Sequence, residues 1–308
     1  MDTARTATNW CSSGIFVPEL ATPRRQIAGR EFDFDRQVAV MAIVNRTPDS
    51  FYDKGRTFAL DAAIDAGRRA WEAGADWVDI GGVKFAPGPP VPVADELERI
   101  VPVVEALRQI DGLVISIDTF QPAVAAASIR AGANVINDTT GLADPEMARV
   151  IADSNAQVII THSLAEARRP YPKPIYHDVV AEVVAHLGER VQRARAAGIP
   201  DDRIIVDPGH DLNKNTLHSL ELTRRFAELT RLGFPVLAAV SNKDFIGESL
   251  DRAQGDRLEG SLAAAVICMM NGARIVRMHD VEAAVAAVRM TETVLGFREP
   301  AYLRHNRE

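Results

Sequence analysis

The sequence is poor in cysteine, since its 308 residues include only Cys11 and Cys268. Two cysteines cannot form a disulfide framework or a zinc site, so stability has to come from a hydrophobic core. Cys268 stands in an apolar run, where we expect a packed core thiol. Cys11 stands in a polar N-terminal stretch, and we expect no role for it.

Excess positive charge and long apolar runs are also missing. The formal net charge is −7 at pH 7, which argues against a nucleic-acid-binding surface. No stretch approaches the roughly 18 apolar residues of a membrane span. The N-terminus has Asp2 and no apolar run, unlike a signal peptide. We therefore expect a cytoplasmic protein with no nucleic-acid or membrane partner.

From Val38 onward, short β-branched runs alternate with Ala-rich amphipathic segments. Strands are expected at 38–44, 77–80, 113–117, 134–136, 157–160, 203–206, 235–240 and 273–276. Helices are expected near 59–73, 94–108, 121–131, 144–153, 178–197, 215–231, 257–271 and 281–295. The apolar runs are continuous rather than alternating, which is typical of parallel strands covered on both faces.

Eight β/α repeats with short joints favour an α/β fold of the closed (β/α)8 type, a TIM barrel, over an open doubly wound sheet. No G-x-G-x-x-G follows the first strand, which weakens the open-sheet interpretation further. Such barrels take about 250 residues. We expect an N-terminal extension at 1–37, one barrel domain at 38–297 and a C-terminal tail at 298–308.

Polar residues follow every predicted strand, and in a barrel all eight strand ends meet at the face where barrel enzymes place their active sites. The carboxylate and amide groups there are Asp118, Asn137 and Asp207. The cationic groups are Lys243, Arg277 and His279. The first set suits a flat ligand rich in N–H donors, such as an aminopyrimidinone ring, and the second suits an anion. Internal ion pairs could explain any single pair of these residues, but not why all of them lie at one end.

The residues after the strands resemble those of dihydropteroate synthases. Residues 45–51 read N-R-T-P-D-S-F, similar to the family motif N-x-T-P-D-S-F. The remaining matches are 78–82, 116–120, 136–138, 207–209 with Lys214, Ser241 with Lys243, and Arg277 with His279 and Asp280. The resemblance covers residues 38–297, nearly the whole predicted barrel.

The resemblance implies a protein that joins dihydropterin diphosphate to p-aminobenzoate and releases diphosphate. It implies a pterin ligand, p-aminobenzoate or sulfonamide-like ligands, Mg²⁺ as cofactor, and a homodimer paired through 261–271 and 281–295. By matched position, Asp118, Asn137, Asp207 and Lys243 would hold the pterin ring, with Asp79 as a supporting acid. Asn45 would bind Mg²⁺ on the diphosphate, and Arg277 and His279 would hold the phosphates. The implied displacement is SN1-like, with diphosphate leaving before the aniline nitrogen attacks.

The departures from the family pattern are concentrated around the second substrate. The family's G-G-E-S-T-R-P-G after the second strand reads G-G-V-K-F-A-P-G here, so Phe85 and Ala86 replace Thr and Arg. Loss of such an arginine costs roughly 1.5–3 kcal/mol at a phosphate contact. Leu212 replaces an aromatic residue and Asn242 replaces an arginine. Asp211 and Asp244 add negative charge in the same loops.

The pterin half of the pattern is therefore retained, while the p-aminobenzoate half is changed. We favour a pterin-binding protein of this family whose synthase activity is weak or lost. The alternatives are an active synthase with altered loops, an enzyme using another nucleophile or pterin, and a non-catalytic pterin-binding or regulatory protein. Pterin-binding methyltransferases that work with cobalamin proteins share the ring contacts but lack the motif at 45–51.

Overall fold

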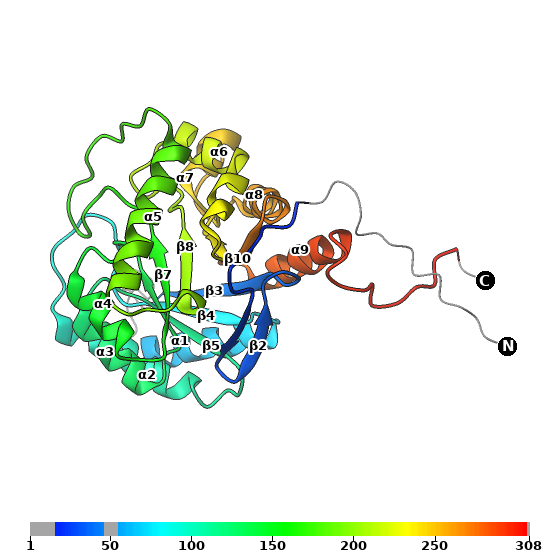
Figure 1. The fold of residues 1–308 in the computed structure, drawn as a ribbon. Coiled ribbons are helices and arrows are strands. Elements are labelled where there is room, and N and C mark those ends of the chain that lie inside the picture. The colour runs from blue at the N-terminus through cyan, green and yellow to red at the C-terminus, as the bar shows by residue number, and fades with distance from the viewer. Residues whose placement is uncertain (1–15, 46–54, 307–308) are drawn as a thin grey trace.

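The computed structural model describes residues 16–45 and 55–306 and shows a closed barrel of eight parallel strands (Figure 1). The strands are β3 Ala39–Asn45, β4 Trp77–Gly81, β5 Val114–Asp118, β6 Val135–Asp138, β7 Gln157–Thr161, β8 Ile204–Asp207, β9 Val236–Ala238 and β10 Ala273–Met278. The barrel closes by parallel pairing of β10 with β3. The predicted TIM barrel is confirmed.

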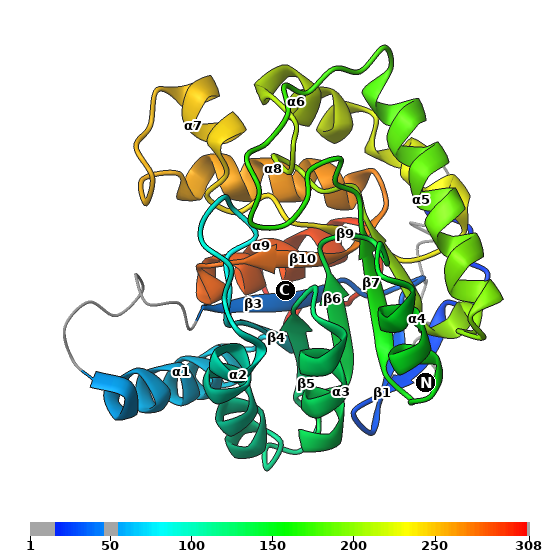
Figure 2. The same ribbon diagram turned by 90° about the vertical axis from the view of Figure 1, so that its left-hand side faces the viewer.

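Helices follow the strands and cover the outside of the barrel (Figure 2). They are α1 Gly55–Glu72, α2 Val93–Leu107, α3 Pro122–Ala131, α4 Pro145–Ala152, α5 Val179–Ala196, α6 Thr216–Arg224, α7 Asp244–Leu250, α8 Leu258–Met270 and α9 Val281–Val294. No helix in the described ranges is long and apolar enough to cross a membrane.

One predicted helix, at 215–231, was wrong in its extent. The α-helix ends at Arg224, and Arg225 has φ −104° and ψ 25° before a 3₁₀ segment, Phe226–Leu232. The Arg225 guanidinium bonds Glu228 and reaches across to Asp178, so a tertiary contact fixes the break. The short helix α7, after β9, was not predicted at all.

Strand side chains alternate between two apolar clusters. Met41, for example, belongs to the cluster inside the barrel, whereas Val40 and Ala42 belong to the cluster between strands and helices. Cys268 lies fully buried in this outer cluster, which confirms the predicted core thiol. Cys11 lies outside the described residues. The two clusters explain why the strand sequences are apolar without interruption.

A hairpin that the sequence did not indicate covers the amino-terminal end of the barrel. It consists of β1 Arg24–Ile27 and β2 Arg30–Asp33, seen in blue in Figure 1. Phe32 is fully buried in the inner cluster and meets the Trp77 ring edge-on at 5.8 Å. Arg25 Nη1 donates to the Ile204 carbonyl at 2.8 Å. The hairpin thus fills the amino-terminal end of the barrel with the buried Phe32 side chain.

Candidate functional site

Asp79, in the middle of β4, organises the floor of the barrel mouth. Its side chain is fully buried, and Ser116 Oγ donates to Oδ1 at 2.6 Å. The other oxygen, Oδ2, accepts from Asn137 Nδ2 at 3.1 Å and from Arg277 Nε at 2.6 Å. Both carboxylate oxygens thus accept hydrogen bonds from protein donors.

Asp118 is the last residue of β5, and Asn137 is the last but one of β6; both retain free hydrogen-bonding capacity. The Asp118 carboxylate is 22% exposed and pairs with Arg277 Nη2 at 3.3 Å. Asn137 is 3% exposed, and its Oδ1 is buried without a hydrogen-bond partner among the described residues. A buried acceptor without a partner is costly, so the Asn137 oxygen points to an N–H donor on a ligand.

Burial and the nearby charge of Asp79 together raise the pKa of Asp118 to about 7, while Arg277 opposes both effects. An acid with this pKa is divided between its two forms at neutral pH. Perturbations caused by burial together with a charged neighbour are typical of functional sites. Asp118 can therefore accept or give a proton as a ligand arrives.

Asp207 and Lys243 complete the floor from β8 and from the residues just after β9. Burial raises the pKa of Asp207, and the Gly209 amide, 2.7 Å from Oδ1, opposes this effect. Burial lowers the pKa of Lys243, against the nearby carboxylates of Asp211 and Asp207. Gly209 has φ 66°, and a Cβ there would lie 2.1 Å from the His162 carbonyl oxygen, so this turn requires glycine.

The two residues predicted to hold phosphate differ in what they already contact. Arg277 is tied to Asp79 and Asp118 and so belongs to the floor. His279 is exposed, and its Nδ1 lies 2.9 Å from Ser241 Oγ. Partial desolvation of the ring and the positive charges of Arg277 and Lys243 lower the pKa of His279 to about 4. It is a neutral group at pH 7.

Asn45, the predicted Mg²⁺ ligand, lies beside the floor at the end of β3. Gly81 of β4 pairs with Asn45 on one side and with Asp118 on the other. A Cβ added to Gly81 would lie 3.5 Å from Asn45 Oδ1 and 3.7 Å from the Cβ of Asp118. The rest of the motif, at 46–51, lies outside the described residues. No cluster of three or more His, Cys, Asp or Glu suited to a metal occurs within 16–45 and 55–306.

Three of the altered positions have structural partners of their own. Asp211 Oδ1 accepts from Ser219 Oγ at 2.8 Å, and Oδ2 accepts from the Phe245 amide at 3.2 Å, at the start of α7. Asn242 adopts φ 59°, a left-handed conformation that asparagine tolerates better than most residues. Its Oδ1 accepts from the Gly255 amide at 2.9 Å. Leu212 is half-buried, and its carbonyl accepts from Lys214.

Lys214 holds the loop after β8 in place. Its Nζ lies 2.8 Å from His162 Nδ1, and it donates to the carbonyls of Gly209 at 3.0 Å and Leu212 at 3.1 Å. Burial lowers the pKa of Lys214 to about 7, although Asp207 opposes this effect. Sequence matching marked Lys214, but only the fold revealed His162 as its partner.

Phe85 and Ala86 lie in the loop between β4 and α2, which meets the loop between β7 and α5. The Phe85 and Tyr171 ring centroids are 6.1 Å apart. Arg168 Nη1 donates to the carbonyl of Ala86 at 2.7 Å. Sequence reasoning missed Arg168, since it stands in a Pro- and Arg-rich stretch without periodic pattern.

The structure thus brings Asp118, Asn137, Asp207, Lys243 and Arg277 together at the carboxyl end of the barrel, around Asp79. Such an arrangement defines a (β/α)8 barrel whose mouth carries a cluster of polar side chains suited to a nitrogen-rich heterocycle. The chain belongs to the pterin-binding enzyme family, because the family model described as "Pterin binding enzyme" matches residues 41–279. Within that family it is similar to dihydropteroate synthases.

Two relatives and one solved structure show this similarity. An inactive dihydropteroate synthase 2 from Mycobacterium leprae is 43% identical over 280 residues, covering 89% of this chain and 96% of the relative. The dihydropteroate synthase of Escherichia coli is 39% identical over 261 residues, covering 84% and 93%. The Xanthomonas albilineans synthase in complex with 7,8-dihydropteroate superposes with a TM-score of 0.80 at 41% identity, covering 88% and 98%.

Proposed function

We propose that this protein binds a pterin at the barrel mouth and that its dihydropteroate synthase activity is weak or lost. The observation that carries the binding proposal is the buried Asn137 Oδ1, which has no partner in the described part of the chain. It lies beside the carboxylates of Asp79 and Asp118, and the site is rich in acceptors for ring N–H groups. The solved relative with 7,8-dihydropteroate supports a pterin as the ligand.

Each floor residue has a proposed contact with the ring. Asp118 and Asn137 accept from ring N–H groups, Asp207 accepts from the exocyclic amine, and Lys243 donates to a ring oxygen or nitrogen. Because the pKa of Asp118 is about 7, a donor-rich ring binds best to its ionised form. Asp79 positions Asn137 and Arg277 without contacting the ring.

The anionic half of the site supports weak catalysis. Ala86 offers no side-chain cation where related synthases have an arginine. Departure of diphosphate depends on such charge stabilisation, so the reaction should be slow even when the pterin is bound. The name of the Mycobacterium leprae relative is consistent with this proposal.

Mg²⁺ is the cofactor we propose, with Asn45 as its protein ligand. Mg²⁺ prefers oxygen ligands, usually keeps several waters and is often held by one or two protein groups together with substrate phosphates. The Asn45 amide oxygen, close to Asp118, fits such a role. Bound there, the ion would neutralise charge on a diphosphate.

A paired experiment tests the proposal. Calorimetric titration with 6-hydroxymethyl-7,8-dihydropterin diphosphate and Mg²⁺ should show binding that Asn137→Ala weakens. Asn271→Ala, on the barrel exterior at the end of α8, is the matched control and should leave binding unchanged. Synthesis of dihydropteroate with p-aminobenzoate should then be far below that of the Escherichia coli relative. Robust product would favour the alternative of an active synthase with altered loops, and absence of binding would refute the site.

We also propose a homodimer in the cytoplasm. Helices α8 and α9 expose apolar side chains, among them Ile267 at 47%, Met290 at 63% and Val294 at 54%. Contiguous exposed apolar surface often marks an interface. Sedimentation equilibrium should give twice the monomer mass, and Ile267→Glu should give the monomer. Cell fractionation tests the location.

A further inference from the structure

Two loops from distant strands meet across one sector of the barrel mouth. The β4–α2 loop comprises residues 82–92, and the β7–α5 loop comprises residues 162–178. Strands β5 and β6 lie between β4 and β7 in the barrel order, and they end with Asp118 and with Asn137 and Asp138. Contact between the loops therefore spans the sector that contains Asp118 and Asn137, two residues of the proposed pterin floor (Figure 2).

Arg168 joins the two loops with a single side chain. Its guanidinium donates to the carbonyls of Lys84 at 3.0 Å, Ala86 at 2.7 Å and Pro89 at 3.0 and 3.2 Å. These three carbonyls lie along six residues of the β4–α2 loop, and a planar fork of five N–H donors can satisfy them together. A lysine, with its compact charge, cannot match that geometry.

Main-chain hydrogen bonds reinforce the same contact. The Arg168 amide donates to the Phe85 carbonyl at 3.0 Å, and the Gly88 amide donates to the Arg168 carbonyl at 3.3 Å. Arg168 has φ 63°, an unfavourable conformation for a residue with a side chain, and its bonds to the other loop compensate for it. We call these contacts of Arg168 with residues 84–89 the Arg168 clasp.

Gly88 provides the space for the guanidinium. A Cβ at residue 88 would lie 2.2 Å from Arg168 Nη2 and 2.8 Å from Cζ. Even an alanine would therefore push the guanidinium out of its position. The clasp depends on both partners, an arginine on one loop and a glycine on the other.

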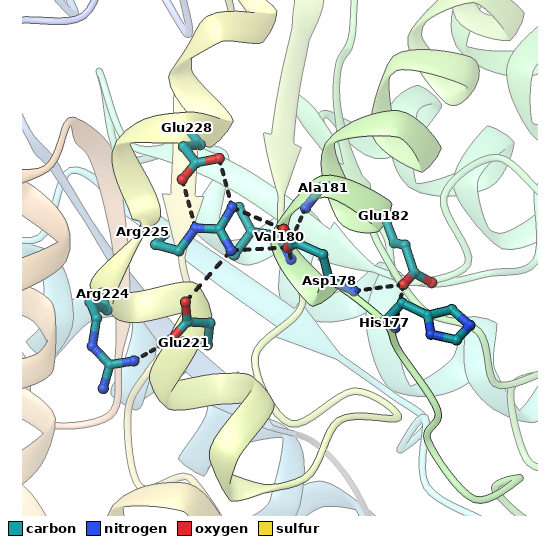
Figure 3. Close-up of polar contacts among 9 residues, drawn as sticks. All are labelled: His177, Asp178, Val180, Ala181, Glu182, Glu221, Arg224, Arg225 and Glu228. Carbon is teal, nitrogen blue, oxygen red and sulfur yellow. Dashed lines mark hydrogen bonds and ion pairs between the residues drawn. The ribbon is translucent and has the colours of Figure 1, made fainter.

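The β7–α5 loop is itself firmly anchored, so it can hold its neighbour. Asn213 Nδ2 donates to the Pro172 carbonyl at 2.7 Å. Where the loop enters α5, Asp178 caps the helix by accepting from the amides of Val180 and Ala181. Figure 3 shows that the Arg225 guanidinium donates to the same Asp178 carboxylate and also to Glu228.

We propose that Arg168 is a positioning residue that holds the β4–α2 loop, with Phe85 and Ala86, in a preformed closed position over the pterin floor. The loop that carries the changed family residues is then fixed before any ligand arrives. A preformed closed loop slows both entry and release of a ring bound beneath it. The kinetic part of this inference rests on the proposed pterin function, whereas the structural part does not.

Hydrogen exchange of the ligand-free protein tests the structural part. Arg168→Ala should speed exchange at the Gly88 amide and its neighbours in 83–91 by about tenfold or more, since several charge-assisted bonds are lost. Gly88→Ala should do the same with Arg168 intact, and Arg168→Lys should give an intermediate rate. Arg169→Ala is the matched control, because the Arg169 side chain is 75% exposed and pairs with Glu166 at 4.0 Å, within its own loop. Unchanged exchange in Arg168→Ala and Gly88→Ala would overturn the clasp.

Stopped-flow fluorescence with 6-hydroxymethylpterin tests the kinetic part. Both association and dissociation should be several-fold faster in Arg168→Ala and Gly88→Ala than in the wild type and Arg169→Ala. If exchange rises while both rate constants stay unchanged, the positioning role toward the ligand is overturned. If the wild type binds no pterin, the proposed function fails, while the exchange result still decides whether the clasp exists.

Discussion

Removal of the Asp79 carboxylate should be among the most damaging single changes at the site. Asp79→Ala would leave the Arg277 Nε, Asn137 Nδ2 and Ser116 Oγ donors without their shared acceptor. Breaking a buried ion pair by deleting one partner costs about 3–5 kcal/mol. Asp79→Asn keeps the shape, and its amide nitrogen can face the Ser116 hydroxyl. It should cost about 1–3 kcal/mol, mainly the difference between charged and neutral hydrogen bonds.

Urea denaturation of the two variants measures these losses. Asp65→Asn is the matched control, because its pair with Arg68 spans 3.9 Å between side chains that are more than half exposed. Such surface pairs contribute about 0–1 kcal/mol. A loss below about 1 kcal/mol for Asp79→Ala would refute the role of Asp79 as the organising acceptor.

Asp79→Asn has a second measurable consequence. The charge of Asp79 helps to raise the pKa of Asp118. Without that charge, Asp118 should titrate at lower pH, and the pH below which pterin binding weakens should fall with it. A loss of stability with no change in this titration would show that Asp79 acts through packing alone.

Three further predictions concern titration, catalysis and the hairpin. With a pKa of about 7 for Asp118, the affinity for 6-hydroxymethylpterin should fall by up to about tenfold per pH unit below 7, and Asp118→Asn should abolish this dependence in calorimetry. Because that pKa is raised, the stabilisation of the folded state by protonated Asp118 is fully present below pH ~4 and is lost as the pH rises through 7. The free energy of unfolding measured against pH in the wild type and in Asp118→Asn tests this direction. The double change Phe85→Thr and Ala86→Arg should raise dihydropteroate synthesis at least about tenfold if this loop is the defect; no gain would direct attention to Asp244, since Asp211 already caps α7. Phe32→Ala should lower the free energy of unfolding by about 3–5 kcal/mol in urea denaturation without changing pterin affinity. A loss of affinity at full stability would contradict the separation between the hairpin end of the barrel and the pterin floor.

The barrel could be predicted because its determinants are local. Each short apolar run of three to seven residues predicts a buried strand, and glycines at joints such as Gly132 and Gly233 end the preceding helical segments with positive φ. The closed topology places all strand ends at one face, so Asp118, Asn137 and Asp207 could be grouped from sequence order alone.

Two elements differ from the predicted ones because of contacts between segments that are distant in the sequence. The helix predicted at 215–231 ends early because Arg225 bonds Asp178, 47 residues away. The hairpin at 24–33 carries little strand pattern of its own, and it forms where Phe32 can fill the end of the barrel. Neither the Arg225–Asp178 pair nor the packing of Phe32 inside the barrel can be recognised from the sequence.

The same division applies to the site. Residue type and order along the chain specify which polar groups reach the barrel mouth, and the resemblance to dihydropteroate synthases follows from them. Only the folded structure shows that Arg277 is bound to two carboxylates, that Asn137 Oδ1 lacks a partner within the described part of the chain, and that Arg168 joins two loops. The physical reason is distance along the chain: hydrogen bonds and desolvation depend on neighbours in space, and Arg277 lies 198 residues from Asp79.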